Sequence, residues 1–215
     1  RIARAASQAL LEYSRNLHDR DLAGYCREIQ RAADLLVSTR PTAVSLPNAI
    51  NLVIKPLMNE SVVEVAWKNL EERASGFIKR SEDAVSIIGA LGARNIRDGD
   101  IILTHCNSEA ALACILNAHQ QGMNIEVYAT EVRPRNQGHI TIKTLSDAGI
   151  KTNFIVDSAA RHFMKEVDLC ITGADAITVN GSVINKIGTS QIALAAHESR
   201  VSFIVAAETY KFAPR

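Results

Sequence analysis

Residues 101–116 read IILTHCNSEAALACIL, and this stretch decides the fold. The apolar run from Ile101 to Thr104 predicts a buried strand, the polar residues after it predict a loop, and the Ala- and Leu-rich part predicts a helix. Similar short apolar runs alternate with helical stretches further on, at Ile125 to Ala129, Thr152 to Val156, Leu169 to Thr172 and Val201 to Ala207. This alternation is typical of an α/β fold, in which crossover helices connect the strands of a parallel sheet.

The chain before this stretch is predicted to be helical. Ala, Leu and Ile recur at helical spacing over Ile2 to Tyr13, and a second helical pattern covers Leu22 to Val37. Two prolines, Pro41 and Pro47, are expected to interrupt the helical pattern, because proline lacks the N–H that a helix interior needs.

A long amphipathic helix is predicted next, opened by the capping box Ser61-x-x-Glu64. Its apolar face consists of Val63, Ala66, Leu70, Ala74, Phe77 and Ile88. The helical periodicity ends between Gly92 and Gly99. We therefore predict an N-terminal helical domain over residues 1–95 and a Rossmann-like parallel-sheet domain over residues 96–215.

The composition argues against nucleic acids and membranes as partners. The 215 residues carry a formal net charge of +1, which gives no overall basic field of the kind that nucleic-acid binders have. No window reaches the roughly 18 uninterrupted apolar residues of a membrane helix, and the first residues lack the apolar stretch of a signal peptide. We expect a cytoplasmic protein with neither a nucleic-acid nor a membrane partner.

Cysteine and histidine spacing argues against a metal site. The four cysteines lie far apart without a C-x-x-C pair, so we expect free thiols rather than zinc ligands or disulfides; they are Cys26, Cys106, Cys114 and Cys170. No two of the six histidines stand at metal-ligand spacing, and His105 is the one nearest a reactive group. Neither G-x-G-x-x-G nor G-x-x-x-x-G-K-[ST] occurs. We therefore expect no metal and no nucleotide or redox cofactor.

Reactive residue types follow the predicted strands. In an open α/β sheet, ligands bind beyond the carboxyl ends of the strands, so these loops should converge on one rim. Cys106 lies between a strand end and a helix start, where backbone N–H groups and the helix dipole are expected to lower its pKa. It could then act as a base or a nucleophile. The alternative is that Cys106 fills space as a small apolar residue, as we expect for Cys114 and Cys170.

Asp175 follows another predicted strand after Gly173 and Ala174. The glycine allows backbone to approach a ligand closely, and the Ala-rich surroundings predict a desolvated carboxyl suited to acid–base work. The alternative is an aspartate that stabilises a turn or caps a helix.

The segment after Asp175 offers groups for an anion. Asn180-Gly181 predicts a hairpin turn, and Asn185 to Ser190 then enters a helix, with the Lys186 ammonium near unpaired backbone N–H groups. Phosphate is the expected anion. Arg133, Arg135 and Lys211 are further candidate cations, although a solvated surface position is the common alternative for each of them and for Lys186.

Four separated motifs carry a family resemblance: Thr104-His105-Cys106-Asn107, Glu131-Val132-Arg133-Pro134 with Gln137-Gly138, Gly173-Ala174-Asp175, and Asn185-Lys186-Ile187-Gly188-Thr189. In this order they resemble one superfamily, which contains ribose-1,5-bisphosphate isomerases, methylthioribose-1-phosphate isomerases and translation initiation exchange-factor regulatory subunits. Arg1 to Ala6 and Thr39 to Val44 also resemble the isomerases, so the resemblance covers nearly the whole chain.

Three features separate the members of this superfamily. The regulatory subunits usually lack the cysteine and the aspartate, so Cys106 and Asp175 favour the enzymes. Glu208 to Phe212 resembles the bisphosphate isomerases, whereas the methylthioribose enzymes typically have Ser-Thr-x-Asp at that place. A methylthioribose-1-phosphate isomerase and a non-catalytic regulatory subunit remain the alternatives, and a turnover assay distinguishes them.

The resemblance implies conversion of ribose 1,5-bisphosphate to ribulose 1,5-bisphosphate in archaeal nucleoside monophosphate breakdown. Cys106 and Asp175 would perform acid–base catalysis through a cis-enediolate, with Cys106 as the hypothesised base and Asp175 handling the oxygen protons. The sugar and its two phosphates would be bound by Arg40, Ser108, Arg133, Gln137, Asn185, Lys186 and Lys211. The resemblance also implies a homo-oligomer, either a dimer or a hexamer of three dimers.

Two features depart from the superfamily pattern. Glu109 stands where a small or neutral residue is expected close to a phosphate, and its carboxylate would repel a dianion unless it caps its helix outward. A glycine-rich segment usually precedes the position of Arg1, and this sequence begins without Met. We therefore expect the natural protein to include terminal segments beyond this sequence.

Overall fold

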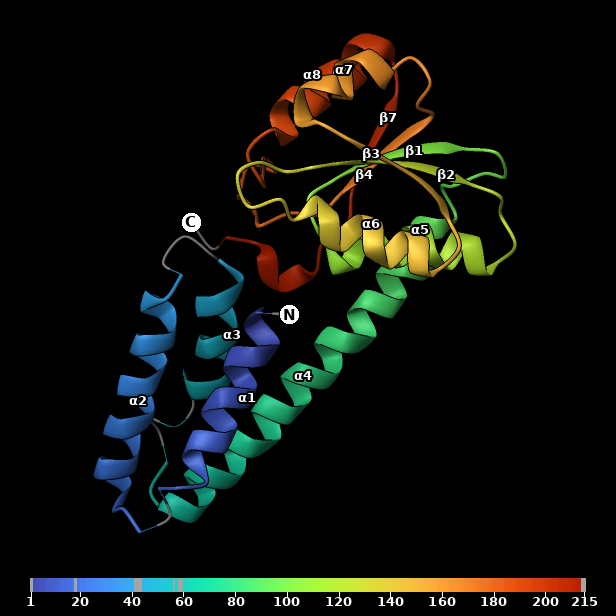
Figure 1. Cartoon of the computed structure of the whole chain (residues 1–215). Helices are drawn as coiled ribbons and strands as arrows, with labels where there is room; N and C mark the ends of the chain where they lie inside the picture. Colours follow the sequence, from blue (N-terminus) through green and yellow to red (C-terminus); the bar gives the residue numbers. More distant parts are fainter. Residues whose placement is uncertain (1, 18, 41–43, 56, 58–59, 214–215) are drawn as a thin grey trace. The chain divides into compact units, whose positions relative to one another are not determined.

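The structure, a computed structural model, describes residues 2–17, 19–40, 44–55, 57 and 60–213 (Figure 1). The chain forms two compact units. The first comprises residues 1–83, 178–180 and 209–215, and the second comprises residues 84–177 and 181–208. In the part of the chain that the structure describes, no helix combines the length and apolar character needed to cross a membrane.

The first unit is helical. Its elements are α1 (Ile2–Ser14), α2 (Leu22–Ser38), α3 (Ser45–Ile54), the first part of α4 (Val63–Ala93) and the short 3-10 helix η3 (Thr209–Lys211). The predicted apolar face of α4 is confirmed within this unit, because Ala66, Leu70 and Ala74 are buried in a core shared with the other helices. The side chain of Asp21 caps α2 by accepting the N–H of Gly24 at 2.9 Å.

Helix α3 corrects the prediction that Pro47 interrupts the helical pattern. Pro47 is the third residue of α3, in its first turn. The N–H groups of a first turn have no intrahelical acceptor, so proline loses nothing at this position and its fixed φ suits the helix. The other predicted interruption, Pro41, lies outside the described residues.

The second unit contains the predicted α/β sheet. Five parallel strands lie in the order β3-β2-β1-β4-β7. Their bounds are β1 (Ile101–His105), β2 (Glu126–Thr130), β3 (Lys151–Ile155), β4 (Leu169–Thr172) and β7 (Ser202–Val205). All five predicted strands are confirmed, with ends that differ by at most two residues. The chain order reverses at β1, between β2 and β4, so the loop after β1 lies at a topological switch point, where such sheets bind ligands.

Helices cover both faces of this sheet. Helices α5 (Glu109–Gln120) and α6 (Gly138–Asp147) lie on one face, and α7 (Ala160–Phe163) and α8 (Thr189–Ser199) lie on the other (Figure 1). Strand residues alternate between the two cores: Ile102 packs with the α5 side, whereas Leu103 packs with the α7 and α8 side. His105, two residues after Leu103, therefore points to the α8 side.

A small hairpin interrupts the crossover between β4 and α8. Strands β5 (Ala176–Ile177) and β6 (Val183–Ile184) pair antiparallel, and Gly181 has a φ of 82° in the turn. The turn signal at Asn180-Gly181 therefore predicted the hairpin correctly, because glycine adopts positive φ without steric cost.

Candidate active site

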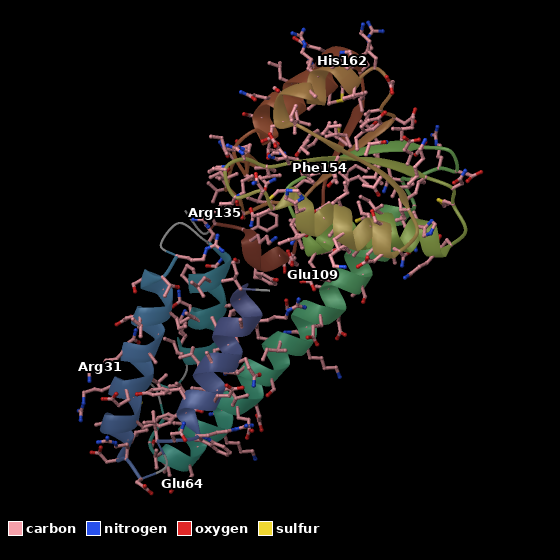
Figure 2. All side chains as sticks on the ribbon, in the orientation of Figure 1. Arg31, Glu64, Glu109, Arg135, Phe154 and His162 are labelled. Atoms are coloured by element: carbon pink, nitrogen blue, oxygen red, sulfur yellow. The ribbon has the colours of Figure 1, made fainter. Side chains whose placement is uncertain are left out.

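The loops after β1, β2 and β4 and the segment before α8 all lie at the carboxyl edge of the sheet. Figure 2 shows Glu109 and Arg135, which follow β1 and β2, on this side of the second unit. Cys106 comes directly after β1 and is half-buried, with a φ of 71°. Its thiol donates to Oε1 of Gln137 at 3.4 Å. The structure therefore brings together two of the predicted site residues from two separate loops.

The pKa of Cys106 differs from the prediction. Burial raises the pKa of this thiol above its ordinary value, with smaller increases from the carboxylates of Asp175 and Asp157. The backbone N–H of Asn107 and the Lys186 ammonium lower it, but burial dominates. The prediction of a lowered pKa was wrong. Burial of the thiol raises its pKa by more than the nearby backbone N–H group and the Lys186 ammonium lower it.

Asp175 is exposed, which contradicts the expected desolvation of its carboxyl. Its backbone N–H donates to the carbonyl of Ile184 at 2.8 Å, so the hairpin holds the start of this segment in place. Asp175 follows β4, which pairs with β1, so this residue lies at the same edge of the sheet as Cys106, and its charge raises the pKa of the Cys106 thiol. The arrangement thus places an accessible carboxylate near a covered thiol.

Gly173 makes room for a side chain and not, as predicted, for a ligand. A Cβ at this position would lie 2.3 Å from Oγ and 2.6 Å from Cβ of Ser108. The glycine therefore makes room for Ser108 rather than for a ligand directly. Ser108 is the N-cap of α5, and its Oγ accepts the N–H of Ala111 at 3.3 Å. Its hydroxyl hydrogen stays available for donation, so the substrate-binding role of Ser108 stays a prediction.

The loop after β2 is held by an aspartate for which the sequence predicted no role. Oδ1 and Oδ2 of Asp157 accept the N–H groups of Val132 and Arg133 at 2.9 and 2.8 Å. Val132 has a φ of 63°, a region that costs a β-branched residue about 1–3 kcal/mol. The two charge-assisted bonds offset this strain. Asp157 directly follows the β3 region, and this position at the carboxyl edge is the signal that could have identified it.

The side chains of this loop have different surroundings. The Arg133 side chain is exposed, as is that of Arg135, whereas Gln137 is half-buried against the thiol.

Helix α6 holds the backbone at Cys106. Thr141 donates from Oγ1 to the Cys106 carbonyl at 2.9 Å. The backbone at Cys106 is therefore tied to α6, which keeps the thiol in a fixed position.

Gly138 allows α6 to start directly against β2. A Cβ here would lie 1.9 Å from the carbonyl oxygen of Thr130 and 3.0 Å from Cα of Glu131. Because these are backbone atoms, Gly138→Ala should force the loop away and lower the free energy of unfolding by about 1–3 kcal/mol. Urea unfolding followed by circular dichroism measures this loss.

Gly76→Ala is the matched control for this prediction. Gly76 lies in α4, and its added Cβ would meet only the guanidinium end of Arg80 at 3.1 Å, which can move away. Alanine in a helix interior is favoured over glycine, so this variant should be as stable as the wild type or more so. Equal effects of the two substitutions would contradict the steric account of Gly138.

The segment before α8 is internally ordered. Nδ2 of Asn185 donates to Oγ1 of Thr189 at 3.1 Å, and this hydroxyl donates to the carbonyl of Lys186 at 2.6 Å. Gly188, with a φ of 99°, is the N-cap of α8 and contributes no capping side chain. The predicted anion-binding residues Asn185 and Lys186 therefore lie at the start of an 11-residue helix.

The other two predicted phosphate ligands belong to the first unit. Arg40 is exposed and follows α2, where its N–H donates to the carbonyl of Val37 at 3.1 Å. Lys211 is the last residue of η3 and is half-buried. Their binding roles stay predictions. Among the described residues, no group of three or more His, Cys, Asp or Glu side chains is arranged to hold a metal ion.

The fold and the site define a class of protein. It has a Rossmann-like sheet preceded by helices, and a thiol, a carboxylate and candidate phosphate-binding groups lie at the carboxyl edge of that sheet. The chain matches the Initiation factor 2 subunit family over residues 1–215 and belongs to that family. The resemblance inferred from the four motifs is thereby confirmed.

Relatives include both isomerases and initiation factors. A ribose 1,5-bisphosphate isomerase of Methanocaldococcus jannaschii is 53% identical over 215 residues, which cover 100% of this chain and 68% of the relative. The structure of the Pyrococcus horikoshii OT3 translation initiation factor eIF-2B is similar, with a TM-score of 0.89 at 33% identity, over 99% of this chain and 74% of that chain. The 5-methylthioribose 1-phosphate isomerase from the same organism has a TM-score of 0.83 at 28% identity, over 98% and 63% of the two chains.

Proposed function

We propose that this chain isomerises ribose 1,5-bisphosphate to ribulose 1,5-bisphosphate. The observation that carries the proposal is the combination of Cys106 and Asp175 at the switch point of the sheet with 53% identity to a ribose 1,5-bisphosphate isomerase along the whole chain. Five further archaeal relatives with this name, from 44% to 52% identical, support it.

The reaction is a balanced set of proton transfers. When the furanose ring opens, the ring oxygen takes up a proton. Protons leave C2 and its hydroxyl group to give a cis-enediolate that keeps the phosphate oxygen on C1. The ketone then forms at C2 as C1 takes up a proton. Two protons are removed and two are added, so the substrate and the product are isomers and no net oxidant is consumed.

Cys106 acts as the base at C2, and Asp175 transfers the oxygen protons. The covered position of the thiol suits attack on a carbon-bound proton away from bulk water, and the exposed carboxylate of Asp175 can exchange protons with solvent between turnovers. Gln137, which already accepts the thiol hydrogen, would bind a sugar hydroxyl together with Ser108 and Asn185.

The phosphates are bound by cations from both halves of the sequence. Lys186 at the start of α8 and Arg133 in the loop after β2 bind one phosphate, with the N–H groups of the helix terminus adding to the attraction. The family resemblance implies that Arg40 and Lys211 bind the other phosphate. With a net charge of only +1, the chain depends on such local cations to bind a bisphosphate.

The test is turnover of ribose 1,5-bisphosphate by the full-length protein, with the product identified by NMR. Formation of ribulose 1,5-bisphosphate is expected. Turnover of methylthioribose 1-phosphate alone would assign the chain to the other group of isomerases. Binding of sugar phosphates without turnover of either substrate would assign it to the regulatory subunits.

We also propose a cytoplasmic homo-oligomer. A thiol that acts as a base must stay reduced, which favours a reducing compartment. The family resemblance supports dimers, and hexamers built from three dimers. Light scattering of the full-length protein measures the mass, and a monomer at micromolar concentration would contradict this part of the proposal.

A further inference from the structure

His105 is a buried titratable residue without a role in the mechanism above. It is the last residue of β1, directly before Cys106, and only 1% of its surface is exposed. Nε2 lies 2.9 Å from the carbonyl oxygen of Ile187, and Nδ1 lies 2.6 Å from Oγ1 of Thr130. Both ring nitrogens are therefore hydrogen-bonded to backbone or side chains from other segments.

These partners determine the tautomer. A carbonyl oxygen only accepts, so Nε2 must carry the hydrogen that is donated to Ile187. Burial lowers the pKa of His105, which favours the neutral ring, and Nδ1 then accepts the hydroxyl hydrogen of Thr130. Two charged groups face the ring: Asp157, whose Oδ1 is 3.9 Å from Nδ1, raises this pKa, and Lys186 lowers it.

The contact with Ile187 involves the segment that carries Lys186. Gly188 lies so close to the imidazole that a Cβ there would be 3.1 Å from Cε1 and 3.2 Å from Nε2 of His105. The chain therefore crosses the edge of the ring with its backbone. Cys106 is the residue directly after His105. The imidazole therefore connects the end of β1, next to the thiol, to the segment that carries Lys186.

Three loops meet at this ring. Thr130 ends β2, and the loop that follows it carries Arg133 and Gln137. Asp157, which faces Nδ1, holds that same loop through the backbone N–H groups of Val132 and Arg133. A change in the ring would therefore act on the geometry of the anion-binding segment and the thiol together.

We propose that His105 is a positioning residue for the isomerase reaction, whose Nε2–H···O bond to Ile187 fixes the Lys186 ammonium relative to the Cys106 thiol. This inference rests on the proposed function and deepens it. If the inference is right, the bond has two effects. It places Lys186 to bind a substrate phosphate, and it keeps Lys186 where its charge lowers the pKa of the Cys106 thiol.

Two substitutions separate the two ring nitrogens. In His105→Gln, the amide Nε2 reaches about as far as the imidazole Nε2 and can donate to Ile187. In His105→Asn, the shorter amide reaches only the position of Nδ1 and can accept from Thr130, but the Ile187 carbonyl loses its donor. We expect KM for ribose 1,5-bisphosphate to rise about tenfold or more in His105→Asn and to stay within about threefold of wild type in His105→Gln. The value of kcat should change less than KM, since Lys186 binds the phosphate in substrate and transition state alike.

A second readout needs no turnover. The pH dependence of Cys106 alkylation by iodoacetamide, followed by mass spectrometry of its peptide, reports the thiolate population. Because Lys186 lowers the Cys106 pKa, the alkylation profile of His105→Asn should shift to higher pH, whereas that of His105→Gln should match wild type. If wild-type protein lacks isomerase activity, the proposed function fails, and alkylation still decides the positioning role.

Identical behaviour of the Gln and Asn variants in both readouts would overturn the inference, as would a loss confined to kcat. If thermal unfolding shows that His105→Asn does not fold, Gly188→Ala tests the same contact from the other side. Its Cβ would press on the ring, and its φ of 99° is strained for alanine. It should raise KM and shift the alkylation profile as expected for His105→Asn, and wild-type values in both readouts would contradict the proposal.

Discussion

Replacing Cys106 with serine should lower kcat for ribose 1,5-bisphosphate by about 100-fold to 10,000-fold and leave KM within about threefold of wild type. Serine keeps the shape of the side chain and can still donate to Gln137, as the thiol does at 3.4 Å. Its hydroxyl is a far weaker acid than a thiol, so the anion that removes the C2 proton is almost never formed. Steady-state kinetics of the folded variant measure the loss.

The pH dependence of the wild-type enzyme tests the same role. Burial raises the pKa of Cys106 above its ordinary value, so the thiolate is the minor form at neutral pH. If the thiolate is the base and the ring oxygen takes its proton from solvent, kcat/KM should rise roughly tenfold per pH unit through neutral and mildly alkaline pH, until the pH reaches this pKa. A kcat/KM that is flat over this range would show either that another group removes the proton or that Asp175 must hold a proton for the ring oxygen, because the carboxylic acid is lost as the thiolate forms.

Cys26→Ser is the matched control for the thiol. Cys26 is partly buried in the helical unit, and its thiol donates to the Leu57 carbonyl at 3.8 Å. The same chemical change at this position should leave kcat and KM at wild-type values. Equal losses in Cys26→Ser and Cys106→Ser would indicate that thiol removal acts through stability and not through catalysis.

The sheet could be predicted from sequence because parallel strands are buried on both faces and form short continuous apolar runs. Leu169 to Thr172 was predicted with the bounds that the structure has, and all four residues are buried. Helix α3 was missed because Pro47 was interpreted as a helix breaker without regard to its place in the first turn. The position of a proline within a helix depends on where the helix begins, and Ser45 gives only a weak signal for that start.

The site could be predicted in its residues but not in its electrostatics. Cys106 and Gln137 belong to motifs on separate loops, and their contact follows from the common carboxyl edge of the sheet. The raised pKa of Cys106 could not be predicted, because burial depends on how other loops cover the thiol. The role of Asp157 also depends on tertiary structure. The pairing of β3 with β2 brings its carboxylate to the backbone of Val132.

Unusual backbone conformations are concentrated at this site. Cys106, Val132 and Asn136 have positive φ without being glycine, and all three lie in the loops after β1 and β2. Each such residue costs about 1–3 kcal/mol, so its conformation persists only where surrounding contacts hold it. The bonds from Thr141 to the Cys106 carbonyl and from Val132 to Asp157 supply such contacts. These conformations are therefore held by neighbouring contacts rather than by local sequence preference, which is why sequence patterns gave no sign of them.

Replacing Asp175 with asparagine should also lower kcat by about 100-fold to 10,000-fold, with little change in KM. Asparagine keeps the size of the side chain and leaves the backbone bond to Ile184, at 2.8 Å, intact, but it cannot accept and return a proton. Because the carboxylate raises the Cys106 pKa, its removal should also shift the alkylation profile of that thiol to lower pH. The variant would then be slower in isomerisation although its thiolate is more abundant.

These opposite effects distinguish proton transfer by Asp175 from an electrostatic effect on Cys106 alone. If the aspartate acted only by keeping the thiol protonated, Asp175→Asn would raise kcat/KM at neutral pH, because more of the base would be present. Asp147→Asn is the matched control: Asp147 ends α6, forms an exposed ion pair with Lys143 at 2.8 Å, and should not affect turnover or alkylation. An Asp175→Asn variant with wild-type kcat would remove this residue from the mechanism and leave the oxygen protons to solvent or to the substrate phosphates.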